Sequence, residues 1–248
     1  MEIEGEIIDV SAGSRHTFLV WNDGTVEAAG FIESAFGYRG HLGLGPVKDC
    51  EDDPSKLCEN INDPLPVEKV VDANGNLVDA PQFIRAYAGV GDSADSGEMH
   101  SLLISKDGKA YVTGNNNKGQ LCLGSLDEDY VDYFHEVKGI DNAERGAVGQ
   151  EFTLILTEDG EVYGCGTNEV GQLGLGDDVD YKAKATKIGG LSGITDLATG
   201  LGFAIFLNEN DDEVWGTGTN LFGQQCAFTE GNPVTEPNEV SKVSVMYA

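Results

Sequence analysis

Histidine is the side chain that most readily transfers protons or binds metals near neutral pH. The chain contains four histidines, which are His16, His41, His100 and His135. None of them has another histidine or a cysteine within four residues, although metal sites and catalytic groups need partners at such spacings. His16 and His100 also stand at equivalent positions of a repeat that has Phe152 and Phe203 there. The pattern favours packing roles and predicts no catalytic, cofactor-binding or metal-binding residue.

Cysteine is the second reactive side chain to place. The five cysteines are Cys50, Cys58, Cys122, Cys165 and Cys226. No two form the C-x-x-C pair that zinc sites and redox motifs use. Cys50 and Cys58 flank an acidic stretch, and their spacing fits a disulfide in an oxidising compartment as well as it fits two free thiols. Cys122 and Cys226 align with Gly174, a small-residue position at a turn, and we expect both to be buried thiols.

Carboxylates dominate the charge of the chain. There are 43 acidic side chains against 15 basic ones, and the formal net charge is -28. Such a charge repels phosphate backbones, so we expect no direct binding of DNA or RNA. A protein partner with a basic surface is the ligand class that the charge favours. Because no run of eighteen apolar residues occurs, the sequence predicts no membrane-spanning helix.

The acids are dense at the start of segment 47–82, where only Lys48 and Lys56 oppose them. Long loops on a rigid scaffold commonly carry recognition. The candidate partner-binding residues are therefore Asp49, Glu51, Asp52 and Asp53. A solvated loop that serves solubility explains the same charges equally well.

Two further acidic stretches follow. Residues 72–79 place oxygen-bearing side chains at a spacing like that of a calcium loop, but the order of residues differs and the closing Glu is absent. Because Asn74-Gly75 lies between two apolar pairs, a β-hairpin turn is the simpler interpretation. The run 127–132 leaves the second copy of the repeat after Gly124.

Known catalytic and nucleotide-binding motifs do not occur. The sequence lacks the P-loop pattern, the G-x-S-x-G elbow and the H-E-x-x-H helix. We therefore expect no enzyme. An active site in a central channel, assembled from residues far apart in sequence, is the less favoured alternative.

The elements that position these side chains belong to an internal repeat with four copies. In each copy an apolar strand precedes a tight turn at Gly24, Gly108, Gly160 or, with Asp in place of Gly, position 212. A second strand then ends in a glycine six residues later, at 30, 114, 166 and 218. The last two turns follow at intervals of 52 residues, whereas the first interval is 84. Such small sheets bury both faces only by stacking on one another.

We therefore predict an all-β fold built from propeller-type blades of antiparallel strands in a single repeat domain, 1–248. The predicted repeats are about 7–46, 83–139, 143–190 and 194–240. Segment 47–82 is an acidic insert in this division. Residues 243–248 are either the start of a fifth repeat or a closing strand.

The repeat resembles the regulator of chromosome condensation repeat family. The most diagnostic piece is G-Q-L-G-L-G at 171–176, which follows Asn168, and the second and fourth copies have Asn116 and Asn220 at the same position. The resemblance covers nearly the whole chain outside the insert, and it implies a β-propeller, which in this family usually has seven blades. With four copies, the chain is part of a larger propeller, or its tail strand pairs onto an end blade, or it closes the arc by self-association.

The resemblance also bears on function. The family contains non-enzymatic scaffolds and inhibitors, and it contains a guanine nucleotide exchange factor for a small GTPase. We predict a non-enzymatic protein-binding scaffold, with exchange activity as the alternative.

Overall fold

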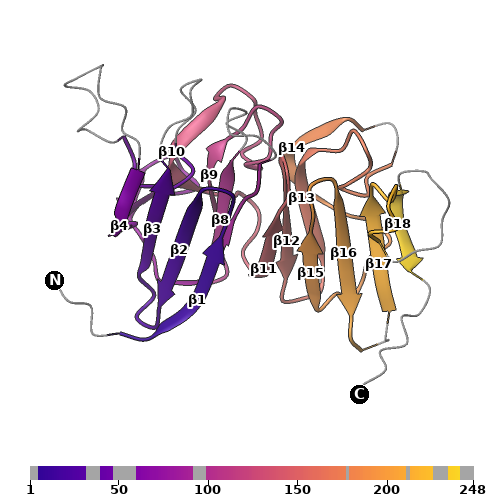
Figure 1. The fold of residues 1–248 in the computed structure, drawn as a ribbon, viewed down its shortest axis with the longest axis horizontal. Helices are drawn as coiled ribbons and strands as arrows, with labels where there is room; N and C mark the ends of the chain where they lie inside the picture. The colour runs from indigo at the N-terminus through magenta and orange to yellow at the C-terminus, as the bar shows by residue number, and fades with distance from the viewer. Residues whose placement is uncertain are drawn as a thin grey trace.

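The structure of the chain is a computed structural model that describes residues 5–31, 40–46, 60–91, 99–176, 179–210, 213–225 and 234–240. The regular elements in these ranges are β-strands, which form four sheets standing side by side in chain order (Figure 1). The prediction of an all-β fold with blades of antiparallel strands is confirmed.

Each sheet is one blade, and the blades are numbered 1 to 4 along the chain. Blade 1 contains β1 (Ile7–Ala12), β2 (His16–Trp21), β3 (Val26–Phe31) and β4 (Asn60–Pro66). Blade 2 contains β7 (Phe83–Ala88), β8 (His100–Ser105), β9 (Ala110–Asn115) and β10 (Tyr130–Glu136). Blade 3 contains β11 (Ala143–Val148), β12 (Phe152–Thr157), β13 (Val162–Thr167) and β14 (Tyr181–Lys187). Blade 4 contains β15 (Asp196–Thr199), β16 (Phe203–Asn208), β17 (Glu213–Gly218) and β18 (Val234–Val240).

The Asp-Gly pairs form the tight turns that the sequence predicts. Gly24, Gly108 and Gly160 have φ of 88°, 77° and 73°, a backbone region that glycine enters without steric cost. In blade 2 the strands on either side are in antiparallel register, with Ile104 opposite Ala110. The turn residues therefore join the second and third strands of these three blades.

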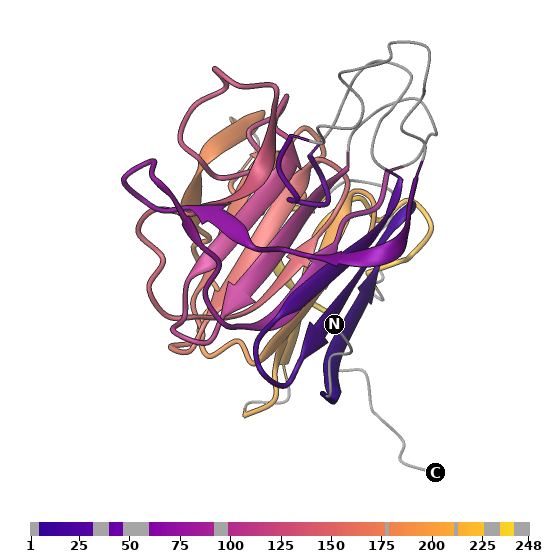
Figure 2. The same ribbon diagram turned by 90° about the vertical axis from the view of Figure 1, so that its left-hand side faces the viewer.

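The first blade extends beyond the predicted repeat 7–46. Strand β4 lies inside the range 47–82 but pairs antiparallel with β3 as the fourth strand of blade 1. The remaining part of this range adds a hairpin, β5 (Lys69–Val71) and β6 (Leu77–Asp79), to the outer edge of blade 2 through parallel pairing of β5 with β10. The predicted hairpin turn at Asn74-Gly75 is confirmed. Figure 2 shows this added hairpin in purple across the side of the molecule.

The core lies between the blades. Strands β8 and β12, at the centre of blades 2 and 3, are buried at every position. Strands β2 and β16 of the end blades are buried only at alternate positions. This difference follows from the stacking, because the two central blades have a neighbour on each face.

One cysteine prediction is wrong. Cys122 is not a free thiol but forms a disulfide with Cys165, and their Cα atoms lie 5.3 Å apart. Cys122 lies in the loop after β9 and meets β13 of the next blade, a contact between repeats that alignment of the repeats does not show. Cys50, Cys58 and Cys226 lie outside the described residues, as do residues 243–248. The described part of the chain contains no helix that is long and apolar enough to cross a membrane.

Candidate partner-binding face

The ends of the blades form two different surfaces. The turn face carries the Asp-Gly turns. The loop face lies at the other end and carries the connections from first to second strand and from third to fourth strand. Its described residues are 13–15, 40–46, 89–91, 99, 116–129, 149–151, 168–176, 179–180, 200–202 and 219–225.

A buried asparagine holds the long loop of blade 2 in place. The Nδ2 atom of Asn116 donates to the carbonyl oxygens of Ser125 and Glu128, at 3.2 and 3.1 Å. Its Oδ1 atom accepts a hydrogen bond from the backbone amide of Leu121. One side chain thus satisfies three backbone groups of the loop, which has no β-sheet hydrogen bonds to pair them.

Blade 3 repeats this arrangement. Asn168 donates to the carbonyl oxygens of Gly176 and Val179, at 3.1 and 2.7 Å, and accepts from the amide of Leu173. In blade 4 the Oδ1 atom of Asn220 accepts from the amide of Gln225. The loops of the three blades therefore leave the sheets in a shared conformation.

The glutamine of the repeat closes the tip of the same loop. The Oε1 atom of Gln120 accepts from the amide of Lys118, and its Nε2 atom donates to Oδ1 of Asn115 at 2.6 Å. In blade 3, Gln172 accepts from the amide of Val170. The tip is fixed from inside, which leaves the remaining side chains of the loop free to face solvent.

Those outward side chains are largely acidic. Asp127, Glu128 and Asp129 are all exposed on the loop that Asn116 holds. Glu169 of the neighbouring blade forms a salt bridge with Lys118, with 2.9 Å between Oε1 and Nζ. This ion pair links two loop tips. The loop face therefore presents fixed carboxylates on a rigid frame, which suits recognition of a basic surface.

Beneath this face, histidines join the blades. The Nε2 atom of His16 lies 2.8 Å from Oγ of Ser101, and that hydroxyl donates to the carbonyl oxygen of His41 at 2.7 Å. Because the hydroxyl has a single proton, which goes to the carbonyl, His16 is the donor in the first contact. Burial holds the pKa of His16 well below its usual value, and it lowers that of His41 to about 4. Both are neutral near pH 7 and link blades 1 and 2.

Blades 2 and 3 are linked by the same hydrogen-bond arrangement. His100 lies 2.9 Å from Oγ1 of Thr153, which donates to the carbonyl oxygen of Gln120. Between blades 3 and 4, Thr217 donates to the carbonyl oxygen of Gln172. These histidines are part of the packing between blades.

The first strands place charges at one repeated position. Asp9, Arg85, Arg145 and Asp196 each stand four residues before the glycine that ends the strand segment. Arg145 lies 3.7 Å from Asp196, and Asp9 accepts from the amide of Ala86. These charges therefore link neighbouring first strands.

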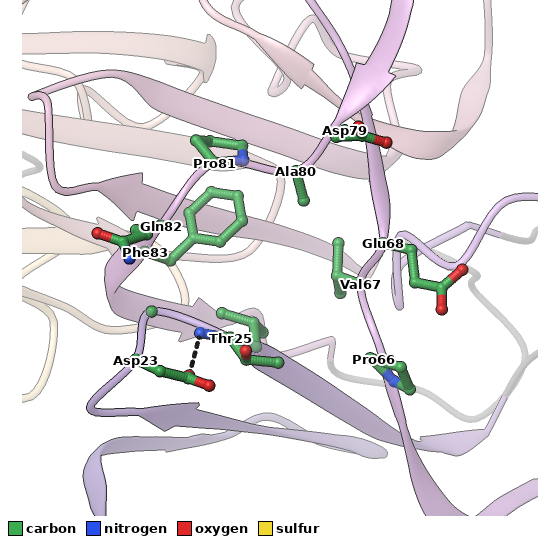
Figure 3. Close-up of a pocket in the computed structure, with 12 residues that line it drawn as sticks. Asp23, Thr25, Pro66, Val67, Glu68, Asp79, Ala80, Pro81, Gln82 and Phe83 are labelled. Atoms are coloured by element: carbon green, nitrogen blue, oxygen red, sulfur yellow. Dashed lines mark hydrogen bonds between the residues drawn. The ribbon is translucent and has the colours of Figure 1, made fainter. Parts of the chain in front are cut away.

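The turn face has pockets of its own. One of about 330 Å³ opens between the turn at Asp23 and the segment that leads from the hairpin to Phe83 (Figure 3). Figure 3 shows Val67 and Phe83 at its apolar side, and Asp23 accepting from the amide of Thr25 at 2.8 Å. A second pocket of about 400 Å³ lies between blades 3 and 4 and includes Arg145. Among the described residues, no histidine, cysteine or serine lines either pocket.

Among the described residues, no cluster of three or more His, Cys, Asp or Glu side chains is arranged to hold a metal ion. The stretch 72–79 serves its hairpin instead, because Asp72 accepts from the amides of Asn74 and Asn76.

The predicted partner-binding residues Asp49, Glu51, Asp52 and Asp53 lie outside the described residues. The described residues on either side of this segment lie at the loop face. The amide of Gly45 bonds the carbonyl of Asp132, and Asn60 pairs with Phe31 at the loop-face end of β3. Gly45 and Asn60, which flank segment 47–59 in the described chain, are therefore both at the loop face.

Sequence reasoning did not assign the roles of the buried asparagine and glutamine. The signal was present, because N-x-x-G-Q recurs at 116–120, 168–172 and 220–224. An amide that recurs in a loop where other residues vary indicates a backbone clamp.

Comparison with known proteins agrees with this geometry. A model of the regulator of chromosome condensation (RCC1) repeat matches residues 93–120 and 146–172. Two RCC1 repeats therefore lie in this chain. The two matched RCC1 repeats include the buried Asn116 and Asn168 and the tip glutamines Gln120 and Gln172.

Relatives with RCC1 repeats are longer than this chain. The chain is 38% identical over 143 residues to Protein RCC2 homolog of Xenopus laevis, covering 57% of this chain and 28% of that protein. It is 42% identical over 81 residues to the secretion-regulating guanine nucleotide exchange factor of Bos taurus, covering 32% and 17%. The solved structure of yeast RCC1 (Prp20) bound to Kap60 matches with a TM-score of 0.73 at 18% identity, covering 99% of this chain and 51% of that one. The chain spans about half or less of these proteins.

Proposed function

We propose that the chain is a non-enzymatic protein-binding module whose loop face receives a partner with a basic surface. The observation that carries the proposal is the exposed run Asp127, Glu128 and Asp129 on a loop that Asn116 fixes from inside. Because the loop is already ordered, binding loses little conformational entropy. The net charge of -28 steers a basic partner toward the molecule.

The segment 47–59 belongs to the same proposal. The described residues that flank it, Gly45 and Asn60, are at the loop face, and the segment contains the sequence-predicted residues Asp49, Glu51, Asp52 and Asp53. Together with the blade 2 loop it would supply a second group of carboxylates for the same partner.

A binding measurement with a strongly basic protein tests the proposal. Core histones serve as the probe, and the variant D127N/E128Q/D129N is compared with the parent chain. Three exposed ion pairs of about 0.5 kcal/mol each correspond to roughly tenfold in affinity, so the variant should bind about tenfold more weakly. The variant D49N/E51Q/D52N/D53N should weaken binding in the same sense.

The matched control changes three acids on the turn face, in the variant E158Q/D159N/E209Q. It removes the same net charge, so it separates the loop face from the general charge of the molecule. The proposal fails if this control weakens binding as much as the loop variant, or if neither variant changes it.

A second candidate function is nucleotide exchange on a small GTPase. It is favoured by one observation, the similarity to a protein named as a guanine nucleotide exchange factor. Release of labelled GDP from a panel of small GTPases tests it directly. Acceleration of release by the chain would support exchange activity, and an unchanged rate across the panel would remove it.

A further inference from the structure

At the turn face, the segment that leads from one blade to the next closes the end of the core. In blade 2 this segment is 138–142, and in blade 3 it is 189–193. Each segment buries one apolar side chain, Ile140 or Leu191, in the core between the blades. A short segment with one buried side chain thus fills the end of these two blades.

Backbone hydrogen bonds identify the equivalent segment of blade 1 as 68–82. The amide of Val67, just before it, donates to the carbonyl oxygen of Val26 at 2.8 Å. The amide of Phe83, just after it, donates to the carbonyl oxygen of Gly24 at 2.9 Å. The corresponding residues of blades 2 and 3 make the same two bonds. The segment of blade 1 therefore starts and ends at the same places but is longer.

The added length removes the side chain that would fill this end. Three positions after Val67, where blade 2 has Ile140, blade 1 has Val70. Val70 belongs to β5 of the added hairpin and pairs with Phe134 of β10. The turn-face pocket of about 330 Å³ opens where the shorter segments bury their apolar residue, with Phe83 and Val67 in its lining.

Three stretches of backbone form the walls of this pocket, and hydrogen bonds join each stretch to the other two. Besides the two bonds of Val67 and Phe83, the amide of Ala80 donates to the carbonyl oxygen of Glu68 at 2.9 Å. Figure 3 shows the residues of these walls around the pocket. Because the walls are fixed to one another, the pocket exists before a ligand binds, which lowers the cost of binding.

The pocket has an apolar base and an acidic rim. Val67 and Phe83 in the base are 5% and 1% exposed. Asp23, Glu68 and Asp79 are exposed on the rim, and the residues that line the pocket include no lysine, arginine or histidine. Figure 3 shows the three carboxylates on different sides of the pocket.

Two of these carboxylates are held in place. Asp23 accepts from the amide of Thr25 at 2.8 Å, and this bond lowers the pKa of Asp23. Asp79 accepts from the ammonium group of Lys69, which lowers the pKa of Asp79. Both are therefore ionised at neutral pH.

We propose that this pocket binds an arginine side chain of a partner protein, with the aliphatic stem against Val67 and Phe83 and the guanidinium at Asp23 and Glu68. Long basic side chains bury their stems on apolar surface and keep the charge in water. A guanidinium is more weakly hydrated than an ammonium and binds carboxylates in a fixed geometry, which favours arginine over lysine. The volume lies at the lower end of the range for ligand pockets and suits a single side chain.

The site is separate from the contact proposed for the loop face, because it lies at the opposite ends of the strands. The loop face offers exposed carboxylates to an extended basic surface, whereas the pocket accepts one side chain. Each can be tested without the other.

The test titrates the peptide Ac-Gly-Gly-Arg-Gly-Gly-amide into the intact chain and follows methyl groups by NMR. The methyl signals of Val26 and Val67 should shift and saturate, with a Kd of about 1–10 mM. Val137, the equivalent of Val67 in blade 2, is the internal control and should not shift, because Ile140 fills that end. The same peptide with citrulline in place of arginine keeps the shape without the charge. It should bind about fivefold more weakly, as the loss of two exposed ion pairs implies.

Two variants test the two parts of the pocket. D23N/E68Q should weaken the arginine peptide by about fivefold and leave the citrulline peptide unchanged. Ala80→Leu places a larger apolar side chain in the pocket and should abolish the shifts for both peptides. The matched control D127N/E128Q removes the same charge from the loop face and should bind the arginine peptide as the parent chain does.

The proposal is overturned if Val26 and Val67 show no saturable shift up to about 20 mM peptide, where a millimolar Kd would be evident. It is also overturned if the citrulline peptide binds as tightly as the arginine peptide, or if D127N/E128Q weakens binding as much as D23N/E68Q. Dispersed methyl spectra confirm that each variant folds, and D23N/E68Q decides the outcome if Ala80→Leu does not.

Discussion

The Nε2 atom of His16 in blade 1 lies 2.8 Å from the Oγ atom of Ser101 in blade 2, which stands 85 residues later in the sequence. The same serine donates to the carbonyl oxygen of His41. This relay ties the start of a strand and a loop of one blade to the next blade. It recurs with His100 and Thr153 between blades 2 and 3, so it belongs to the repeat rather than to a local site.

Substituting Ser101 by alanine should lower the free energy of unfolding by about 1–3 kcal/mol, because two buried polar groups lose their partner. Urea denaturation measures the change. Thr17→Ala is the matched control, since Thr17 holds the same repeat position in β2 of blade 1 and is only half-buried. Substituting Thr17 should lower the free energy of unfolding by much less. Equal losses at the two positions would contradict a role for the relay in joining blades.

Stability should fall as the pH falls from about 6.5 toward 4. The pKa of His41 is about 4 in the folded chain because of burial, and an unfolded histidine titrates near 6.5. Between these values the unfolded chain binds more protons, so stability decreases with falling pH, by at most about 1.4 kcal/mol per pH unit for one group. The pKa of His16 is lowered in the same direction.

The variant His41→Gln isolates this effect, because the repeat itself has Gln120 and Gln172 at the equivalent position. Urea midpoints at pH 7 and pH 5 should differ less for the variant than for the parent chain. An identical pH dependence would show that His41 does not titrate as its burial requires.

Asn116→Ala should loosen the acidic loop of blade 2. The side chain bonds three backbone groups, and leaving buried groups unsatisfied costs about 1–3 kcal/mol. Amide hydrogen exchange should accelerate in residues 121–129. Asn117→Ala, at the adjacent exposed position, should leave exchange unchanged. Faster exchange in both variants would mean that contacts at the surface of the loop, rather than the buried side-chain amide of Asn116, keep the loop ordered.

Gly166→Ala should destabilise the chain by more than about 2 kcal/mol through backbone strain. Gly166 has φ of 100°, and an added Cβ would stand 2.2 Å from the carbonyl oxygen of Glu151. Gly189→Ala provides the comparison, because an added Cβ there has open space, and its effect should stay within about 0.5 kcal/mol. Thermal melts of the two variants measure this, and similar melting temperatures would contradict it.

Most of the fold followed from the repeat itself. The turn at Gly108 and the closing glycine at 114 recur at fixed spacing, and this predicted strands whose second and third members pair through a tight turn. Strand β4 was harder to place, because the segment before it lengthens the connection from β3 and hides its equivalence to β10. The added hairpin β5–β6 was predicted as a turn, but its parallel pairing with β10 depends on tertiary contacts.

The site was less predictable than the fold. Composition indicates an acidic binding surface, and the acidic run 127–132 follows Gly124 where loops leave the blade, although its residues 130–132 belong to β10. The role of Asn116 was missed because its partners are backbone groups, which sequence patterns do not identify. The disulfide of Cys122 with Cys165 was missed for a similar reason, since it joins different positions of two neighbouring repeats.

We propose that the loop face, and not the turn face, receives the partner. The most direct measurement is hydrogen exchange of the chain with and without bound core histones. We expect slower exchange in residues 116–129 and 168–176, with no change at the turns 106–109 and 158–160. Protection of those turns, with the loops unchanged, would contradict it.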